Sequence, residues 1–220
     1  MKSIVSFAIS ITPFNFVRIF LYNILLGYKI DYKSKIGCFN IINSKSVKMS
    51  NAKIGRFNYI KSDNIEMAAS SNINKFNRIK NLHTLKIGER SRIFDRNFIG
   101  GSPEGVVIDG FDFKEQKVIL GKDTAVNRGN FFDVVRSIVI GNNVVFGGFG
   151  AEIWTHGFET DRTMLVGAVE FGNDIFIGSK CVFTKSVKVA DDVTIGPASV
   201  VYKSISEKGI YSSHNIYKIK

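Results

Sequence analysis

His156 is the residue of this sequence best suited to proton transfer, and it stands in a polar stretch beside the only tryptophan of the chain, Trp154. An imidazole ordinarily titrates close to neutrality, so it can accept a proton from a hydroxyl group and later release it. A carboxylate on the other ring nitrogen would fix the tautomer, and Glu152, Glu159 and Asp161 are near enough in sequence to supply it. The stretch therefore predicts general-base chemistry, with Trp154 as a further substrate contact.

Metal and redox chemistry are not indicated. His83, His156 and His214 lie far apart in the sequence, and no pair of them has the spacing of zinc ligands. Cys38 and Cys181 also lie far apart in the sequence, and they suggest neither a disulfide framework nor a metal motif. We expect no metal, and a cytoplasmic protein in a reducing environment.

The net charge of +11 suggests either an anionic partner or a surface of solvated lysines, and the sequence leaves both open. Long basic runs and the signatures of nucleic-acid-binding modules are missing, so we expect no nucleic-acid partner.

Period six is the strongest pattern of the chain. In the C-terminal region, large apolar residues recur at every sixth position without a slip, mostly followed by a small residue: Phe171, Ile177, Phe183, Val189, Ile195 and Val201. Looser matches extend upstream to Ile36. A period of six is compatible with the two-residue alternation of strands and incompatible with a helix of 3.6 residues per turn. The repeat predicts short strands joined by tight corners and stacked as a solenoid.

Two breaks interrupt the repeat, at about residues 100–117 and 153–170. Insertions in a solenoid lie on its surface, and such loops often carry function. The second break contains His156. We therefore expect the first to shape a cleft or to be a plain insertion, and the second to carry the active site.

The repeat resembles that of the hexapeptide-repeat acyltransferases, whose fold is a left-handed parallel β-helix. Asn130 to Asp133, Ile140-Gly141 and Thr155-His156 are similar to the corresponding motifs of maltose- and galactoside-type O-acetyltransferases. This resemblance implies that His156 is the catalytic base and that Asp133 positions the acceptor hydroxyl or orients the base. It also implies transfer of an acetyl group from acetyl-CoA to a hydroxyl of a sugar or glycan, as in capsule or lipopolysaccharide modification.

The same resemblance implies a homotrimer with active sites between subunits, and acyl-CoA in a groove along the late coils. The residues expected to border acetyl-CoA are Gly178, Ser179, Pro197, Ala198, Lys203, Lys218 and Lys220. The C-terminal segment lacks the glycine and proline of the family's usual ending, which leaves its lysines to pair with phosphates as point charges. The alternatives are N-acetylation of an amino sugar nucleotide and a non-catalytic scaffold with the same repeat. A γ-class carbonic anhydrase, which shares the fold, would need zinc-binding histidines that this spacing does not provide.

Residues 1–35 are expected to form an apolar helix and a linker ahead of the β-helix domain of residues 36–220. Thr12-Pro13 predicts a helix N-terminus, and Gly27 predicts its end. The apolar residues of this segment are too interrupted for a membrane span. Its apolar face either packs on protein or rests on the inner face of the cytoplasmic membrane, aided by nearby basic residues.

Overall fold

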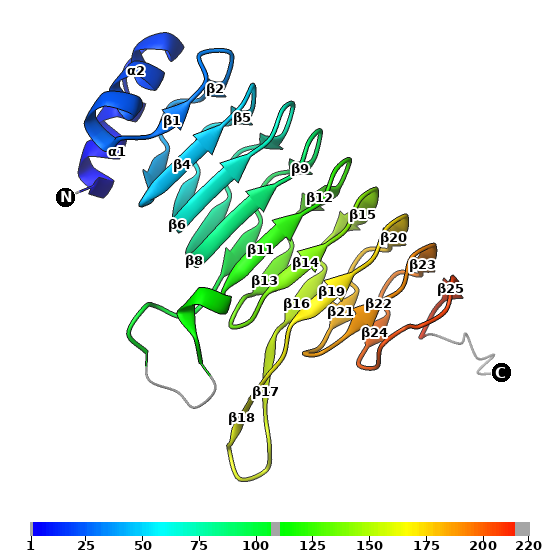
Figure 1. The fold of residues 1–220 in the computed structure, drawn as a ribbon. Helices are drawn as coiled ribbons and strands as arrows, with labels where there is room; N and C mark the ends of the chain where they lie inside the picture. The colour runs from blue at the N-terminus through cyan, green and yellow to red at the C-terminus, as the bar shows by residue number, and fades with distance from the viewer. Residues whose placement is uncertain (1, 107–110, 214–220) are drawn as a thin grey trace, which may run out of the picture.

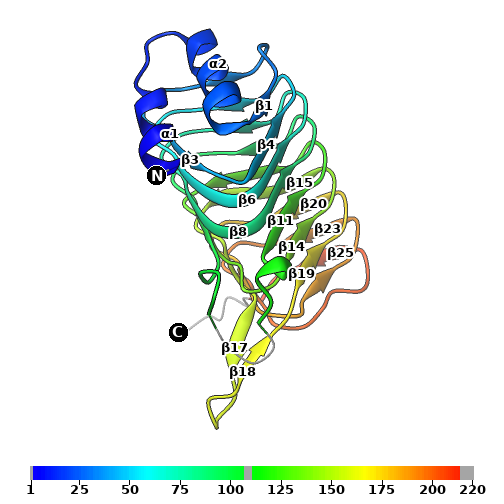
Figure 2. The ribbon, with the colours of Figure 1, turned by 60° about the vertical axis from the view of Figure 1, so that its left-hand side comes forward.

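The chain winds into a parallel β-solenoid whose short strands stack coil upon coil (Figure 1). The computed structural model describes residues 2–106 and 111–213. Each coil has three faces, and one of them is a sheet of nine strands, so the solenoid comprises nine coils. Viewed from a second direction, the coils form one column with two helices at its N-terminal end (Figure 2). The predicted β-solenoid is confirmed.

The first face carries the candidate site and is formed by β3 (Ile41–Asn43), the first part of β6 (Tyr59–Met67), the first part of β8 (Arg78–Ile87), β10 (Phe98–Gly100), β13 (Phe131–Asp133), β16 (Glu152–Trp154), β21 (Val182–Phe183) and β24 (Val200–Val201). The second face is formed by β1 (Lys29–Ile30), β4 (Ser46–Met49), the later parts of β6 and β8, β11 (Lys117–Leu120), β14 (Ile138–Ile140), β19 (Val169–Phe171) and β22 (Lys188–Val189). The third face is formed by β2 (Lys35–Ile36), β5 (Lys53–Ile54), β7 (Asn72–Ile73), β9 (Arg92–Ile93), β12 (Ala125–Arg128), β15 (Val144–Phe149), β20 (Ile175–Ile177), β23 (Val193–Ile195) and β25 (Gly209–Tyr211).

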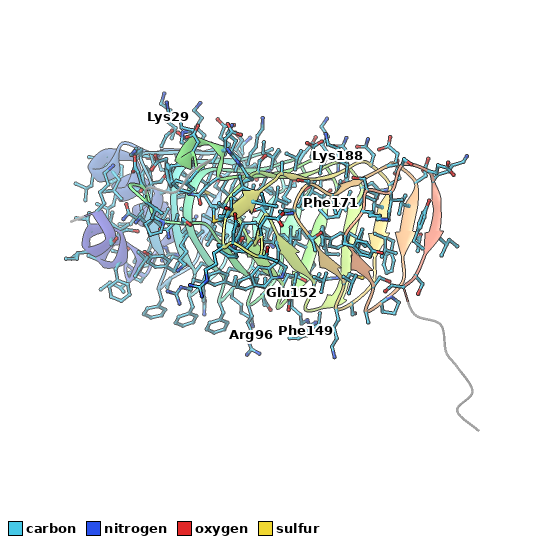
Figure 3. All side chains as sticks on the ribbon, turned by 90° about the horizontal axis from the view of Figure 1, so that it is seen from below. Lys29, Arg96, Phe149, Glu152, Phe171 and Lys188 are labelled. Atoms are coloured by element: carbon cyan, nitrogen blue, oxygen red, sulfur yellow. The ribbon has the colours of Figure 1, made fainter. Side chains whose placement is uncertain are left out.

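The apolar anchors of the repeat point inward and form one continuous core. The six consecutive anchors from Phe171 to Val201 are all buried, and so are the upstream matches from Ile36 to Phe146. Parallel pairing places each anchor on the equivalent anchor of the next coil, as Phe132 on Ile153. The hydrophobic effect therefore acts along the whole column. Figure 3 shows Lys29 and Lys188 of the second face on one side of the column and Arg96 and Phe149 on the opposite side.

A ladder of buried asparagines marks the corner between the third and first faces. Each amide oxygen before the last accepts hydrogen bonds from the backbone N–H and the side chain of the asparagine one coil later, as Asn97 Oδ1 does from Asn130 at 2.9 Å. Asn130 Oδ1, at the end of the ladder, accepts from Ala151 N at 2.8 Å. The ladder consists of Asn40, Asn58, Asn77, Asn97 and Asn130. It continues the hydrogen bonding of the sheets around a turn at which the backbone leaves the strand.

Two helices close the N-terminal end, α1 (Lys2–Ser10) and α2 (Asn15–Leu26). The single helix predicted for residues 13–26 was incomplete, and the predicted N-cap at Thr12 was wrong. Thr12 Oγ1 instead donates to Ile9 O at 2.9 Å, at the end of α1, while Phe14 precedes α2 without a side-chain cap. Gly27 ends α2 in the left-handed conformation, as predicted (φ 69°). Neither helix, within the described part of the chain, is long and apolar enough to cross a membrane.

The helices pair with the first coil through two asparagine side chains. Asn15 donates to Ser34 O and accepts from Ile36 N, both at 2.9 Å, and Asn23 does the same with Ile30 at 3.0 Å. These amides satisfy backbone groups that an edge strand would otherwise leave unpaired. Strand pairing begins at β1, before the boundary predicted at residue 36, because Lys29 and Ile30 already pair with Lys48 and Met49.

Both interruptions of the repeat leave the column at the corner between the first and second faces. The first lies between β10 and β11 and contains a 3-10 helix (Phe113–Glu115). The second forms an antiparallel hairpin of β17 (His156–Phe158) and β18 (Met164–Val166), so it is shorter than the predicted range of 153–170. Ile153 and Val169 remain in the column as buried core residues. Figures 1 and 2 show the insertion and the hairpin projecting from the same edge of the solenoid.

Candidate active site

His156 and Asp133 form a hydrogen-bonded pair at this corner. Asp133 Oδ2 lies 2.5 Å from His156 Nδ1, and the two side chains are 22% and 16% exposed for His156 and Asp133 respectively. With Nδ1 donating to the carboxylate, Nε2 is the ring nitrogen left to accept a proton. The pair has the arrangement of a base and its orienting carboxylate.

Parallel stacking brings the two residues together. Asp133 ends β13, and its partner on the next coil is Trp154, two residues before His156. The intervening Thr155 is fully buried. Its Oγ1 accepts from Val135 N at 2.8 Å and Arg136 N at 3.0 Å, and donates to Asp133 O at 2.9 Å. Thr155 therefore ties the base of the hairpin to the turn after Asp133 and sets the position of the histidine ring.

Burial raises the pKa of the Asp133 carboxyl above its ordinary value, and the hydrogen bond from His156 opposes this shift without cancelling it. A carboxylate in such surroundings interacts strongly with an imidazolium because little water screens the pair. Transfer of a proton to His156 would thus be compensated by an adjacent negative charge.

The carboxylates expected near His156 from the sequence lie elsewhere. Glu152 accepts a hydrogen bond from Trp154 Nε1 at 3.0 Å. Glu159 and Asp161 are exposed beyond the hairpin strands, where Asp161 accepts from Thr163 N. The structure therefore assigns the ring contact to Asp133, which is distant in sequence and adjacent in space.

The two insertions flank the pair along the solenoid axis. The first leaves from the coil before that of Asp133, and the hairpin leaves from the coil after it. A buried polar side chain closes the neck of the first insertion: Gln116 accepts from Ser102 N at 2.6 Å and donates to Ser102 O and Asn81 O. The pair thus lies between two anchored projections.

An aromatic stack on the first face leads to the pair, and the sequence analysis missed it. The rings of Phe98 and Phe131 stack 5.0 Å apart, and Trp154 lies 5.0 Å from Phe131. Arg78 and Lys80 place their charged groups 5.9 and 5.4 Å from the Phe98 centroid. The signal available in the sequence was an aromatic residue immediately before the anchor in two of the coils, Phe98-Ile99 and Phe131-Phe132.

The residues expected to bind the acyl donor divide into three groups. Gly178 and Ser179 stack on Pro197 and Ala198 in one column, with Ala198 N donating to Ser179 O at 2.8 Å. This column lies at the corner between the third and first faces. Lys203 lies beyond β24, across the first face from it, and is exposed. Lys218 and Lys220 lie outside the described residues.

A groove among the described residues lies away from the pair. It has a volume of about 820 Å³ and follows the third face beside α2, where Lys35, Lys53, Arg56 and Phe57 line it. Among residues 2–106 and 111–213, no group of three or more His, Cys, Asp or Glu side chains could hold a metal ion.

Comparisons with known proteins establish the fold. No family model and no curated protein matches the chain. Among solved structures, LpxA from Acinetobacter baumannii is 15% identical, with a TM-score of 0.61 over 85% of this chain and 67% of that one. The polysialic acid O-acetyltransferase OatWY is 19% identical, with a TM-score of 0.51 over 84% and 80%. A maltose O-acetyltransferase from Clostridium difficile 630 is 20% identical, with a TM-score of 0.43; the match covers 59% of this chain and 62% of that enzyme. The chain has the left-handed β-helix fold of hexapeptide-repeat acyltransferases, as predicted.

Proposed function

We propose that the protein transfers an acetyl group from acetyl-CoA to a hydroxyl group of a sugar or glycan, with His156 as the general base. The observation that carries the proposal is the hydrogen bond between His156 Nδ1 and Asp133, placed between two insertions of a left-handed β-helix. One solved structure of similar fold is, by its name, a polysialic acid O-acetyltransferase. Function is argued from the site, because a shared fold alone does not specify chemistry.

The proposed reaction uses both nitrogens of the histidine ring. Nε2 accepts the proton of the acceptor hydroxyl as its oxygen attacks the thioester carbonyl carbon. The imidazolium that forms is stabilised by Asp133 at Nδ1. When the tetrahedral intermediate collapses, the carbon–sulfur bond breaks and the imidazolium returns the proton to the leaving thiolate. The products are the O-acetyl ester and CoA.

A sugar acceptor is supported by the aromatic stack beside the pair. The rings of Phe98, Phe131 and Trp154 stack on one another and stay partly exposed, so together they form an apolar strip on which the C–H groups of a sugar ring can pack. They continue along the first face in the direction of the solenoid axis, which suits an extended glycan.

A homotrimer with active sites between subunits is part of the proposal. The donor column at Gly178, Ser179, Pro197 and Ala198 lies at one corner of the triangular coil and His156 at another. A face of about five residues separates them by roughly 15 Å, given a strand rise of ~3.3 Å per residue. Within one chain the two corners stay this far apart. In a trimer, the donor column of one subunit can lie next to the His156 corner of the neighbouring subunit.

The central test replaces His156 with alanine. We expect acetyl transfer to fall by about 10²- to 10⁴-fold, the usual contribution of a general base, while the thermal stability, the oligomer mass in solution and the stabilisation by acetyl-CoA remain. Transfer is measured as CoA release with a panel of oligosaccharides. His83→Ala is the matched control, because His83 lies on β8, where its Nδ1 forms a hydrogen bond with the hydroxyl of the adjacent Thr84 at 3.0 Å.

Full activity of His156→Ala would remove the histidine from the mechanism. Absence of acetyl-CoA stabilisation in the wild type would instead indicate a scaffold. Transfer confined to amino sugar nucleotides would indicate N-acetylation.

We also propose that the protein is cytoplasmic and rests on anionic membrane surface through its N-terminal helices. Phe16, Phe20 and Ile24 share the outer face of α2 and are 65%, 47% and 62% exposed. The first thirty residues contain no acidic residue, and the basic groove lies beside α2. Exposed apolar side chains next to clustered cations are typical of interfacial helices.

A further inference from the structure

Two cations lie on the first face, close to the proposed base and outside any role assigned above. Arg78 and Lys80 belong to β8, two coils before β13, and both are directed to the ring of Phe98. Their positions are set by the parallel register: Lys80 pairs with Gly100, and Gly100 pairs with Asp133. With neighbouring strands ~4.8 Å apart, the backbones of Lys80 and Asp133 are roughly 10 Å apart.

Gly100 lets the side chain of Lys80 extend along this row. A Cβ on Gly100 would lie 3.1 Å from the Phe98 ring and 3.2 Å from Lys80 Cγ, so these two side chains cover the glycine. The aliphatic part of Lys80 therefore packs on the coil that adjoins Asp133. Its ammonium group lies 5.4 Å from the centroid of the Phe98 ring, on the coil next to that of Asp133.

Both cations lack a carboxylate partner among the described residues. Some basic side chains of the solenoid pair with carboxylates, as Lys45 with Asp63 at 2.7 Å and Lys188 with Glu170 at 3.1 Å. No ion pair is formed by Arg78 or Lys80 within residues 2–106 and 111–213. Two unpaired cations held over one aromatic ring form a site suited to an anion.

We propose that Arg78 and Lys80 bind an anionic group of the acceptor, a carboxylate or a phosphate carried by a sugar near the hydroxyl that is acetylated. This inference rests on the proposed function. The acceptor would run along the first face, with its sugar rings over the exposed edges of Phe98 and Phe131, its anionic group at Lys80 and its reacting hydroxyl at His156. The anions of acetyl-CoA are the other source of the same chemistry. They are less suited, because the expected donor residues lie on the later coils and the two cations on the earlier ones.

The test compares Lys80→Gln with Lys86→Gln. Lys86 lies on the same strand, on the second face, and is exposed. The acceptors are oligosaccharides of glucose, of glucuronic acid and of phosphorylated glucose. We expect Lys80→Gln to raise the KM for whichever charged acceptor is used by about 10-fold, the value of one charge-assisted hydrogen bond. The KM for the glucose oligosaccharide and for acetyl-CoA should stay unchanged, and Lys86→Gln should change none of them. Salt should reduce the preference for the charged acceptor.

A second measurement separates this inference from the proposed function. Binding of the same oligosaccharides to the His156→Ala protein, measured by calorimetry, requires no turnover. Tighter binding of a charged oligosaccharide than of the glucose oligosaccharide, lost in the double variant with Lys80→Gln, would support the site even if acetyl transfer failed. Equal binding of charged and neutral oligosaccharides would overturn the inference, and so would a Lys80→Gln effect confined to the KM for acetyl-CoA.

Discussion

At the scale of single residues, the site depends on a contact that spans 23 positions of sequence and one step of the solenoid. Asp133 contacts His156 because β13 and β16 are neighbours in parallel register. Thr155 fixes the distance by bonding the turn after Asp133. A change at Thr155 would therefore act on catalysis through the position of the ring, without a change in the reacting groups.

Asp133→Asn is expected to lower activity and raise stability. The pKa of the Asp133 carboxyl is raised in the folded protein, so stability is lost as the pH rises through that pKa and the buried group ionises. An amide removes this cost at neutral and mildly alkaline pH. It also withdraws the charge that stabilises the imidazolium, and kcat should fall by about 10²- to 10⁴-fold.

Thermal unfolding over a pH series checks the stability half of this prediction. The gain of Asp133→Asn should shrink toward acidic pH, where the wild-type carboxyl is protonated in both the folded and unfolded states. A variant that is less stable than the wild type at alkaline pH would contradict the assigned role of burial.

At the scale of the elements, the corners of the coils are held by stacked polar side chains. Asn97 lies inside the asparagine ladder, bonded to Asn77 before it and to Asn130 after it. Asn97→Ala would leave the backbone N–H of Asn130 buried without its acceptor. We expect a loss of about 1–3 kcal/mol in the free energy of unfolding, the cost of an unsatisfied buried group.

Denaturant unfolding measures this loss, with Asn127→Ala on the adjoining β12 as the control. Asn127 is half-buried and lies outside the ladder, so its replacement should cost much less. Equal losses for the two variants would show that the ladder adds nothing beyond ordinary burial.

The column was predictable from the sequence because one physical requirement repeats along it. Every sixth side chain must enter a narrow core, and Phe171 or Ile177 shows this without reference to any distant residue. The pairing of His156 with Asp133 was less accessible, because nearness in sequence favours Glu152 whereas nearness between coils favours Asp133. Resemblance identified the two residues, and only the register of β13 and β16 brought them together.

Features set by contact between side chains were not predictable. α1 was missed because its sequence contains no capping signal. Without α1, Thr12 was taken as the start of the following helix, whereas its hydroxyl bonds Ile9 O at the end of α1. The aromatic stack at Phe98 and Phe131 depends on which coils become neighbours. The first insertion separates them in sequence, so the six-residue spacing does not predict their contact.

At the scale of the whole molecule, apolar exposure and positive charge gather at the N-terminal end. The double variant Phe16→Ser, Phe20→Ser is expected to lose most of its co-sedimentation with vesicles of phosphatidylcholine and phosphatidylglycerol. Lys35→Gln and Lys53→Gln should each weaken it by about five-fold, since a basic residue near an anionic surface contributes about 1 kcal/mol.

Phe149→Ser, Phe176→Ser is the matched control, because both phenylalanines are exposed (56% and 49%) on later coils. Vesicles of phosphatidylcholine alone should retain little protein. If the wild type ignores both vesicles and the Phe16, Phe20 variant instead loses oligomer mass, the helices form a subunit contact.

The amides of Asn15 and Asn23 limit where coils can be added to the solenoid. They occupy backbone groups of Ile30, Ser34 and Ile36 in the first coil, which blocks the addition of a strand of another molecule at these positions. Each inner coil, by contrast, pairs only with the coil before it and the coil after it. Duplication of a coil during evolution is therefore tolerated in the interior, where the copy finds matching partners on both sides, while the start of the solenoid stays where the helices set it.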